Sequence, residues 1–205
     1  MTHQKPDAGW TPKWRPLLFL GLFVVITGCG GDRLPHQDMF HAYQHALAAT
    51  ESHMLTDWST RPDDLTTAIN RLQAYYREIT RSSVERLTKD VYANDAYLCD
   101  TLHIAHGADQ IEAYFLQTSE RVNSMHVTIL DHSVSGGEVY TRWTMTIAAD
   151  KLAGGQPVTT FGTSHFRLNP EGKVILHQDF WDASAGFFEH LPGLGQIIPR
   201  IRGTL

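Results

Sequence analysis

The stretch Val91-Tyr-Ala-Asn-Asp-Ala-Tyr-Leu-Cys-Asp100 constrains the fold of this chain more than any other. It begins at the end of a predicted helix, and Asn94-Asp95 predict a turn because their side chains bond nearby backbone and tolerate unusual dihedral angles. A short strand then closes on the carboxylate of Asp100. Since side chains alternate along a strand, Leu98 and Asp100 share one face. An acid beside a leucine is either solvated or held in a pocket, and the function depends on which applies to Asp100.

Helical patterns dominate the chain before and just after this stretch. Residues 36–58 predict one loosely amphipathic helix. Arg61-Pro-Asp-Asp64 predicts a helix start, with proline near the first turn and acids at the positive end of the helix dipole. Ser82 or Ser83 predicts the cap of a second helix, and residues 108–118 predict a third.

From Ser124 onward the apolar period changes to two, which is typical of strands. Strands are predicted over 125–130, 139–147, 158–168 and 174–181, and Gly136-Gly137 is a hairpin signal between the first two. Helices followed by antiparallel hairpins indicate an α+β protein. A bent sheet wrapped over helices would leave a concave interior, which is a natural site for a small molecule. A short helix is predicted from Ala183 to Leu191, ahead of a tail broken by glycine and proline.

Composition describes an ordinary globular protein of 205 residues with a formal net charge of −5. The acidic balance argues against nucleic acid as a partner. The histidines show no defensible ligand spacing, so no metal is expected. No glycine-rich phosphate loop or serine-elbow motif occurs, and no cofactor is expected. Cys99 is interpreted as a small core residue.

The N-terminus has the pattern of a secretory signal. Lysines and an arginine precede an apolar run from Leu17 to Ile26, which is too short to span a bilayer as a helix. Ile26-Thr-Gly-Cys29 resembles a bacterial lipobox, in which the cysteine is diacylated and becomes the mature N-terminus. Lipid chains on Cys29 would tether the protein to an envelope membrane, facing the periplasm.

Three motifs together resemble the SnoaL-like branch of the nuclear transport factor 2-like domains: Tyr92-Ala-Asn-Asp-Ala96, His106-Gly107 leading into a helix, and Gly172-Lys-Val-Ile-Leu-His-Gln-Asp-Phe-Trp-Asp182. The resemblance covers roughly Leu65 to Glu189. It implies a cone, formed by a curved antiparallel sheet wrapped around N-terminal helices, with an apolar pocket and often a homodimer. The expected organisation is a signal peptide over 1–28, a lipidated linker and extra helix over 29–62, the cone domain over 63–190 and a tail over 191–205.

Ketosteroid isomerase is the nearest mechanistic comparison in this superfamily. Its base is an aspartate that ends the strand after a Tyr-Ala-Asp-Asp-Ala turn, and Asp100 occupies that place here. The resemblance brings Tyr76 to the position of its oxyanion-hole tyrosine. Ser164 falls where the isomerase has a protonated aspartic acid, and a serine would stabilise developing negative charge less well.

Several other side chains are candidates for the site. Trp143, Phe161 and Phe166 are expected as pocket wall or core, and strand parity does not decide between these. His177 and Asp179 share a strand face and could form an acid–base pair. We expect them to face outward, because Phe180 continues the side of Leu176.

The leading hypothesis is an envelope-anchored lipoprotein whose domain binds a small, largely apolar molecule. One alternative is an isomerase, cyclase or hydratase with Asp100 as general base and Tyr76 as hydrogen-bond donor. Another is a protein-interaction module of the cell envelope. A buried, pocket-facing Asp100 near Tyr76 would favour the enzyme.

Overall fold

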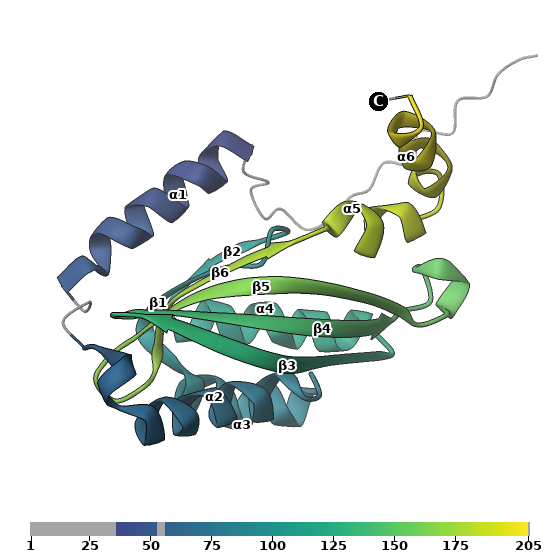
Figure 1. Ribbon diagram of the computed structural model, residues 1–205. Coiled ribbons are helices and arrows are strands. Elements are labelled where there is room, and N and C mark those ends of the chain that lie inside the picture. The colour runs from purple at the N-terminus through teal and green to yellow at the C-terminus, as the bar shows by residue number, and fades with distance from the viewer. Residues whose placement is uncertain (1–35, 53–55, 205) are drawn as a thin grey trace, which may run out of the picture. The chain divides into compact units, whose positions relative to one another are not determined.

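The structure, a computed structural model, describes residues 36–52 and 56–204 (Figure 1). The predicted signal segment 1–28 and the lipidation site Cys29 lie outside these residues, so both stay predictions. Within the described part of the chain, no helix is long and apolar enough to cross a membrane.

Three helices pack on one face of the sheet and begin close to the predicted places. They are α2 (Pro62–Tyr76), α3 (Arg81–Val91) and, after the first strand, α4 (Ala108–Arg121). In Figure 1, α2 and α3 lie beneath the strands and α4 lies behind them. The start of α2 at Pro62 confirms the prediction from the proline and the two acids. The cap of α3 is Thr80 rather than a serine, because Ser83 lies at the third helical position and completes a reciprocal capping box with it.

The six strands form one curved, unclosed sheet in the order β2-β1-β6-β5-β4-β3. Their bounds are β1 (Tyr92–Cys99), β2 (Ile104–His106), β3 (Ser124–Ser135), β4 (Glu138–Ala148), β5 (Val158–Leu168) and β6 (Val174–Trp181). The α+β class and the cone-like sheet are confirmed. One pairing departs from the antiparallel expectation, because β1 and β6, the second and third strands of the sheet, run parallel.

The predicted turn at Asn94-Asp95 is wrong, because both residues lie inside β1. The pairing of β1 with β6 shifts register between Tyr92 and Tyr97, so the two exposed residues are accommodated as an irregularity of the strand. Gly107 lies against this irregularity with φ +80°, and a Cβ there would come within 2.7 Å of the Asn94 carbonyl oxygen. Only glycine fits this approach without strain.

The concave inner face of the sheet packs on α2, α3 and α4. This is the main core, and its fully buried members come from every layer: Leu72, Tyr75, Val84, Leu98, Ile111 and Val139. The turn from α3 directly into β1 carries the chain from the helix layer into the sheet, so the strand that ends at Asp100 is covered by helices on its inner side.

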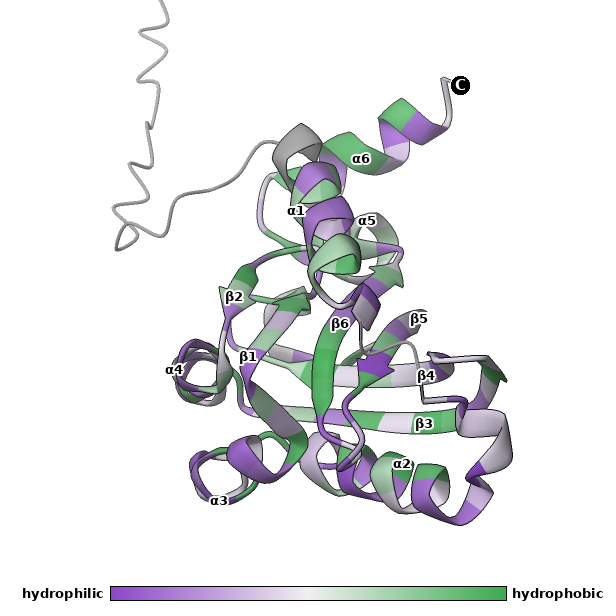
Figure 2. Cartoon of the chain, turned by 90° about the vertical axis from the view of Figure 1, so that its left-hand side faces the viewer, coloured by the Kyte–Doolittle hydropathy of each residue, from purple (hydrophilic) through white to green (hydrophobic). Residues whose placement is uncertain are grey.

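The outer face carries a second, smaller core under α1 (His36–Ala49). Ala46 of this helix packs on Tyr97, Cys99 and Leu176 of β1 and β6. Figure 2 shows α1 on the side of the molecule away from α2 and α3. Helix α1, from the segment 29–62 that was assigned to a linker and extra helix, therefore contacts the cone domain directly. The strands β1 and β6 are buried on both faces where it packs.

The C-terminal segment forms short helices beyond β6. The predicted helix after Ala183 exists as two short pieces, α5 (Ala183–Gly186) and η4 (Phe188–His190). The tail, expected to be broken by glycine and proline, instead forms α6 (Leu194–Arg202), which contains Pro199.

Candidate functional site

Asp100 lies on the inner face, directly after β1, where three donors hold its carboxylate. Oδ1 accepts hydrogen bonds from the backbone amides of Leu102 (2.9 Å) and His103 (2.8 Å). Oδ2 accepts one from the hydroxyl of Tyr114 on α4. The turn that supplies the two amides follows from the positive φ of Thr101, 77°, which reverses the chain immediately after the acid.

Burial raises the pKa of the Asp100 carboxyl, although the hydrogen bonds from Tyr114 and the two amides oppose the shift. The nearby charge of Asp179 raises this pKa further. Burial also raises the pKa of the Tyr114 hydroxyl, with Asp100 as the next cause, so Tyr114 stays a donor. The environment of Asp100 is therefore that of a desolvated acid and not of a solvated one.

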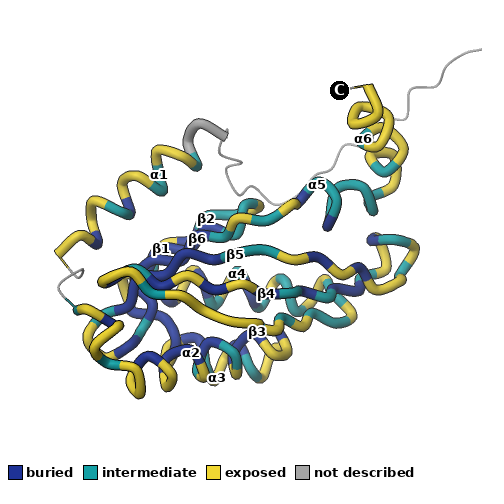
Figure 3. The backbone as a smooth tube through the Cα atoms, in the orientation of Figure 1, coloured by how far each residue is buried: buried dark blue, intermediate teal, exposed yellow. Residues whose placement is uncertain are grey.

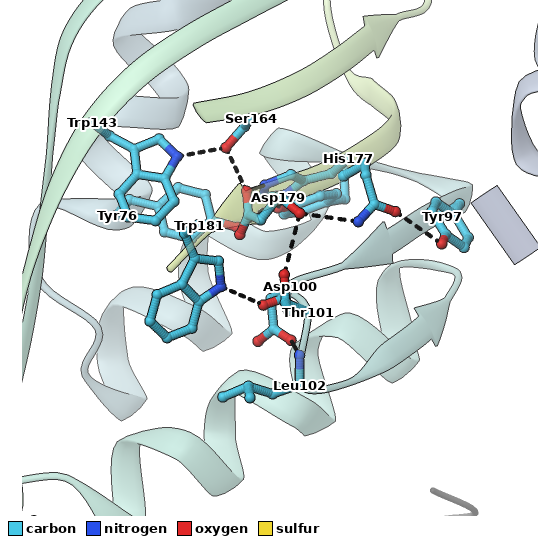
Figure 4. Close-up of polar contacts among 12 residues, drawn as sticks. Tyr76, Tyr97, Asp100, Thr101, Leu102, Trp143, Ser164, His177, Asp179 and Trp181 are labelled. Carbon is cyan, nitrogen blue, oxygen red and sulfur yellow. Dashed lines mark hydrogen bonds and ion pairs between the residues drawn. The ribbon is translucent and has the colours of Figure 1, made fainter. Parts of the chain in front are cut away.

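Asp179 on β6 is the neighbour of Asp100 across the parallel pair. Cys99 pairs with Gln178, which places the next residue of each strand side by side on the inner face (Figure 4). The hydroxyl of Thr101 donates to the Asp179 carbonyl oxygen at 3.3 Å and links the two strand ends. The site thus contains two carboxyl groups, on adjacent strands.

A buried chain of hydrogen bonds ends at Asp179. The Nε2 of His177 lies 2.7 Å from Asp179 Oδ1, and the hydroxyl of Tyr92 lies 2.8 Å from His177 Nδ1. The imidazole of His177 thus bridges the two residues, with Nε2 facing the Asp179 carboxyl and Nδ1 facing the Tyr92 hydroxyl. The hydroxyls of Tyr76 and Tyr92 are hydrogen-bonded to each other, which extends the chain to the first helix of the cone.

Ser164 and Trp143 approach the same carboxylate from β5 and β4. The Trp143 Nε1 donates to Ser164 Oγ at 2.8 Å, and Ser164 donates to Asp179 Oδ1. Gly162 makes room for this arrangement, since a Cβ there would lie 2.4 Å from the Trp143 ring and 2.7 Å from Trp181 Cβ. Asp179 Oδ1 is therefore the terminal acceptor of donors from two directions, whereas its Oδ2 makes no hydrogen bond among the described residues.

Tyr76 does not reach Asp100 in the structure. Its hydroxyl is buried beside Tyr92 and lies 3.4 Å from His177 Nδ1, and burial raises its pKa well above the usual value. The tyrosine that donates to Asp100 is Tyr114, which comes from α4 and not from the first helix of the cone. The position of Tyr114 in the helical pattern of the sequence did not predict its contact with Asp100. That contact depends on how α4 packs against the end of β1.

The predicted inner-wall aromatics divide between the two faces. Trp143 and Phe166 are buried on the inner side, where Phe166 contacts the ring of His177 with centroids 4.4 Å apart. Phe161 is 73% exposed. Alternation along β5 puts Phe161 on the opposite face from Ser164 and Phe166, so it lies outside the cone.

The predicted outward orientation of His177 and Asp179 is wrong. Ser164 pairs with Asp179 and Phe166 with His177, and all four side chains face inward. Phe180 is on the outer face and is 50% exposed. The inference failed because Leu176 is buried by α1 on the outer face and not by the cone interior.

Two cavities lie away from this acid pair. One of about 230 Å³ is between the α2–α3 turn and the start of β3. Another of about 500 Å³ is a groove on the outer face of β3 and β4, lined by Asp131, Tyr140 and Arg142 among others. Near the acids, the half-buried side chains of Tyr114 and Trp181 border the site, and the Trp181 Nε1 donates to the Asp100 carbonyl oxygen at 2.9 Å.

Residues 72–177, slightly more than half of the chain, match the family model described as the SnoaL-like domain. No curated protein sequence matches the chain. Solved structures with a similar fold include three bacterial proteins. A hypothetical protein with a ketosteroid isomerase-like fold from Catenulispora acidiphila, in complex with trimethylamine, has 17% identity and a TM-score of 0.52 over 60% of this chain and 91% of that one.

An LEH-like epoxide hydrolase from M. tuberculosis has 14% identity and a TM-score of 0.51, covering 68% of this chain and 93% of that one. TsrD from Streptomyces laurentii has 16% identity and a TM-score of 0.51, covering 63% and 96%. At these identities the similarity shows a shared fold.

Proposed function

This chain belongs to the SnoaL-like domain family, and we propose that it is an envelope-anchored lipoprotein whose domain binds a small, largely apolar molecule at the inner face of the sheet. The observation that carries the proposal is the pair Asp100 and Asp179, bordered by the partly exposed rings of Tyr114 and Trp181. Aromatic side chains beside a few convergent polar groups are typical of small-molecule sites.

The polar groups of this site are held in place by the protein's own hydrogen bonds. Asp100 is fixed by a helix side chain and two backbone amides, and Asp179 by His177 and Ser164. Such preorganisation lowers the entropic cost of binding. The free Oδ2 of Asp179 offers an acceptor to a donor group on an otherwise apolar ligand.

Binding can be tested through the tryptophans that border the acids. We expect the neutral probe N-phenylnaphthylamine to quench the fluorescence of Trp143 and Trp181 and to gain emission itself on titration. Trp181→Phe should weaken this response. Trp58→Phe should not, because Trp58 lies just before α2, away from the two acids. Equal responses from the wild type and Trp181→Phe would contradict binding at the inner face.

The lipid anchor is supported by the position of Ile26-Thr-Gly-Cys29 directly after the apolar run. Cys29→Ser should release the protein from the membrane fraction. Unchanged membrane fractionation of this variant would contradict the anchor. Intact-mass measurement of the wild type would report the diacylglycerol independently.

We propose proton transfer as a second candidate function of the same site, on the basis of the raised pKa of Asp100. A partly desolvated acid holds its proton closer to working pH, which suits general acid–base chemistry. Asp179 is better placed than Asp100 to accept a proton from a substrate. Its Oδ2 makes no hydrogen bond among the described residues, and its Oδ1 is hydrogen-bonded to His177. Tyr76 then influences Asp179 indirectly, through the hydrogen bonds of Tyr92 and His177. Ser164 orients the Asp179 carboxyl group.

Enolisable carbonyl compounds are the substrates to screen, because a base next to a hydrogen-bond donor abstracts a proton beside a carbonyl group. Exchange of substrate hydrogen for deuterium in heavy water would report the step directly. Asp179→Asn and Asp100→Asn should each abolish exchange while the fold persists by circular dichroism. Hydrogen–deuterium exchange of the substrate that continues in both variants would contradict acid–base chemistry at this site.

A further inference from the structure

Helix α6 displays an apolar stripe that nothing in the described chain covers. Leu194, Ile197 and Ile201 are 42%, 50% and 54% exposed, and Figure 3 shows most of the helix in the colour of exposed residues. Their spacing, with Ile198, places all four side chains on one side of the helix. Arg200 and Arg202 lie on opposite flanks of this stripe at 100° per residue.

The orientation of α6 is fixed by its inner edge. The Nη1 of Arg202 lies 2.5 Å from Glu189 Oε1, and its Nη2 lies 3.2 Å from Ser184 Oγ. Gly195 allows a close approach, since a Cβ there would come within 2.2 Å of the Glu189 carbonyl oxygen. The helix is therefore docked through Gly195 and Arg202, with Ile197 and Ile201 turned away from the domain.

The position of α6 relates it to the anchored end of the chain. In both Figure 1 and Figure 2, α1 and α6 lie at the end of the domain away from α2 and α3. His36, the first residue of α1, follows Cys29 by seven positions. Seven residues span at most about 25 Å, so a lipid on Cys29 would hold the start of α1 within that distance of a bilayer.

We propose that α6 is a membrane-surface helix, which lies in the interface of an anionic phospholipid bilayer with Leu194, Ile197 and Ile201 inserted between the acyl chains. The inference rests on the proposed lipid anchor at Cys29. A short apolar stripe with Arg200 on its flank is the chemistry that such interfaces bind. The segment from Pro192 onward carries two arginines and no acidic side chain in a chain that is acidic overall. Arg202 is paired with Glu189 and Asp182 of the domain, so Arg200 is the cation that matches anionic headgroups.

Docking of α6 would orient the domain on the membrane. The tether alone leaves rotation free, whereas a second contact at α6 fixes one end of the domain against the lipid. The helices α2 and α3 would then point away from the bilayer. A largely apolar ligand dissolved in that bilayer would be presented to a domain of fixed orientation.

The test uses the full-length lipidated protein in vesicles of phosphatidylglycerol and phosphatidylcholine. An environment-sensitive fluorophore on Ile201→Cys should shift its emission to shorter wavelength and be quenched by brominated acyl chains. The same fluorophore on Arg86→Cys of α3 should do neither. Labelling is selective because Cys99 is buried and Cys29 carries the lipid.

Matched variants identify the cause of the shift. Ile197→Glu should remove the shift at position 201, whereas Gln196→Glu, on the opposite side of the helix, should preserve most of it. Emission that stays water-like in every vesicle would overturn the proposal. A shift that appears without vesicles and grows with protein concentration would also overturn it, since a second copy would then cover the stripe.

Failure of the anchor can be separated from failure of α6. Intact mass shows whether Cys29 carries lipid. If it does not, the anchor proposal fails, and the Ile201→Cys protein, with Cys29→Ser added so that only position 201 is labelled, is added to preformed vesicles. A shift at Ile201→Cys there supports α6 as a membrane contact in its own right, and no shift overturns it.

Discussion

Asp100 and Asp179 lie side by side on the inner face because they follow the paired residues Cys99 and Gln178 of two parallel strands. Each carboxylate is held from a different side. Asp100 receives the Tyr114 hydroxyl from a helix, and Asp179 receives His177 and Ser164 from within the sheet. Each acid therefore has its own set of hydrogen-bond donors.

The stability of the Asp100→Asn variant should depend on pH. Burial raises the folded-state pKa of this carboxyl, so its contribution to stability is full below the unfolded pKa and is lost as pH rises through the folded pKa. Asparagine does not ionise and can still accept from the two amides. Relative to wild type, Asp100→Asn should therefore gain stability as pH rises above about 4. Urea unfolding at pH 4 and pH 7 checks this, with the exposed Asp95→Asn as control, and a constant difference would contradict it.

The Tyr92→Phe variant should lose about 1–3 kcal/mol of unfolding free energy, the usual cost of leaving buried polar groups unpaired. Tyr92 links Tyr76 to His177. Without the Tyr92 hydroxyl, the Nδ1 of His177 would lose its closest hydrogen-bond partner. Tyr140→Phe is the matched control, because that hydroxyl is on the exposed outer face. Urea midpoints measure both, and equal midpoints for the two variants would show that the chain of hydrogen bonds contributes nothing.

Arg167→Met should loosen α1. The Arg167 guanidinium pairs with Glu138 at 2.6 Å and donates to the Leu47 carbonyl oxygen at 2.6 Å and to Thr50 Oγ1 at 2.9 Å. The loss should approach the roughly 3–5 kcal/mol seen when one partner of a buried pair is removed. Hydrogen exchange of α1 amides should accelerate.

Arg142→Met provides the contrast for that variant. Its pair with Asp131 is exposed, and such pairs contribute little to stability. Unaltered exchange of α1 in Arg167→Met, or an equal effect in Arg142→Met, would contradict the role given to Arg167.

A homodimer, implied by the family resemblance, should form through the outer face of the sheet. Phe161 and Phe180 on adjacent strands are exposed there, and grouped exposed apolar side chains often mark contact surfaces. Phe161→Asp should shift the protein from dimer to monomer in sedimentation equilibrium, whereas Leu130→Asp on the edge strand should not. Wild-type protein that stays monomeric at all protein concentrations would contradict the prediction.

The sequence by itself determined the elements and the fold class. Proline and two acids placed the start of α2, the change of apolar period placed β3 to β6, and Gly136-Gly137 placed the first hairpin. These features are local, because caps, turns and alternation depend on residues close together in the chain. The sequence placed Asp100 on the same face as Leu98 and left open whether that face is solvated or held in a pocket; the structure shows that Leu98 is buried.

Only the tertiary structure decided the partners at the site. Alternation shows that His177 and Asp179 share a face, but which face is inner depends on α1, which buries Leu176 on the outer side. Likewise the partner of Asp100 is Tyr114 and not Tyr76, because α4 and not α2 packs beside the end of β1. Contacts between residues far apart in sequence depend on how layers pack, and a periodic pattern fixes the faces of each element without fixing which neighbour covers them.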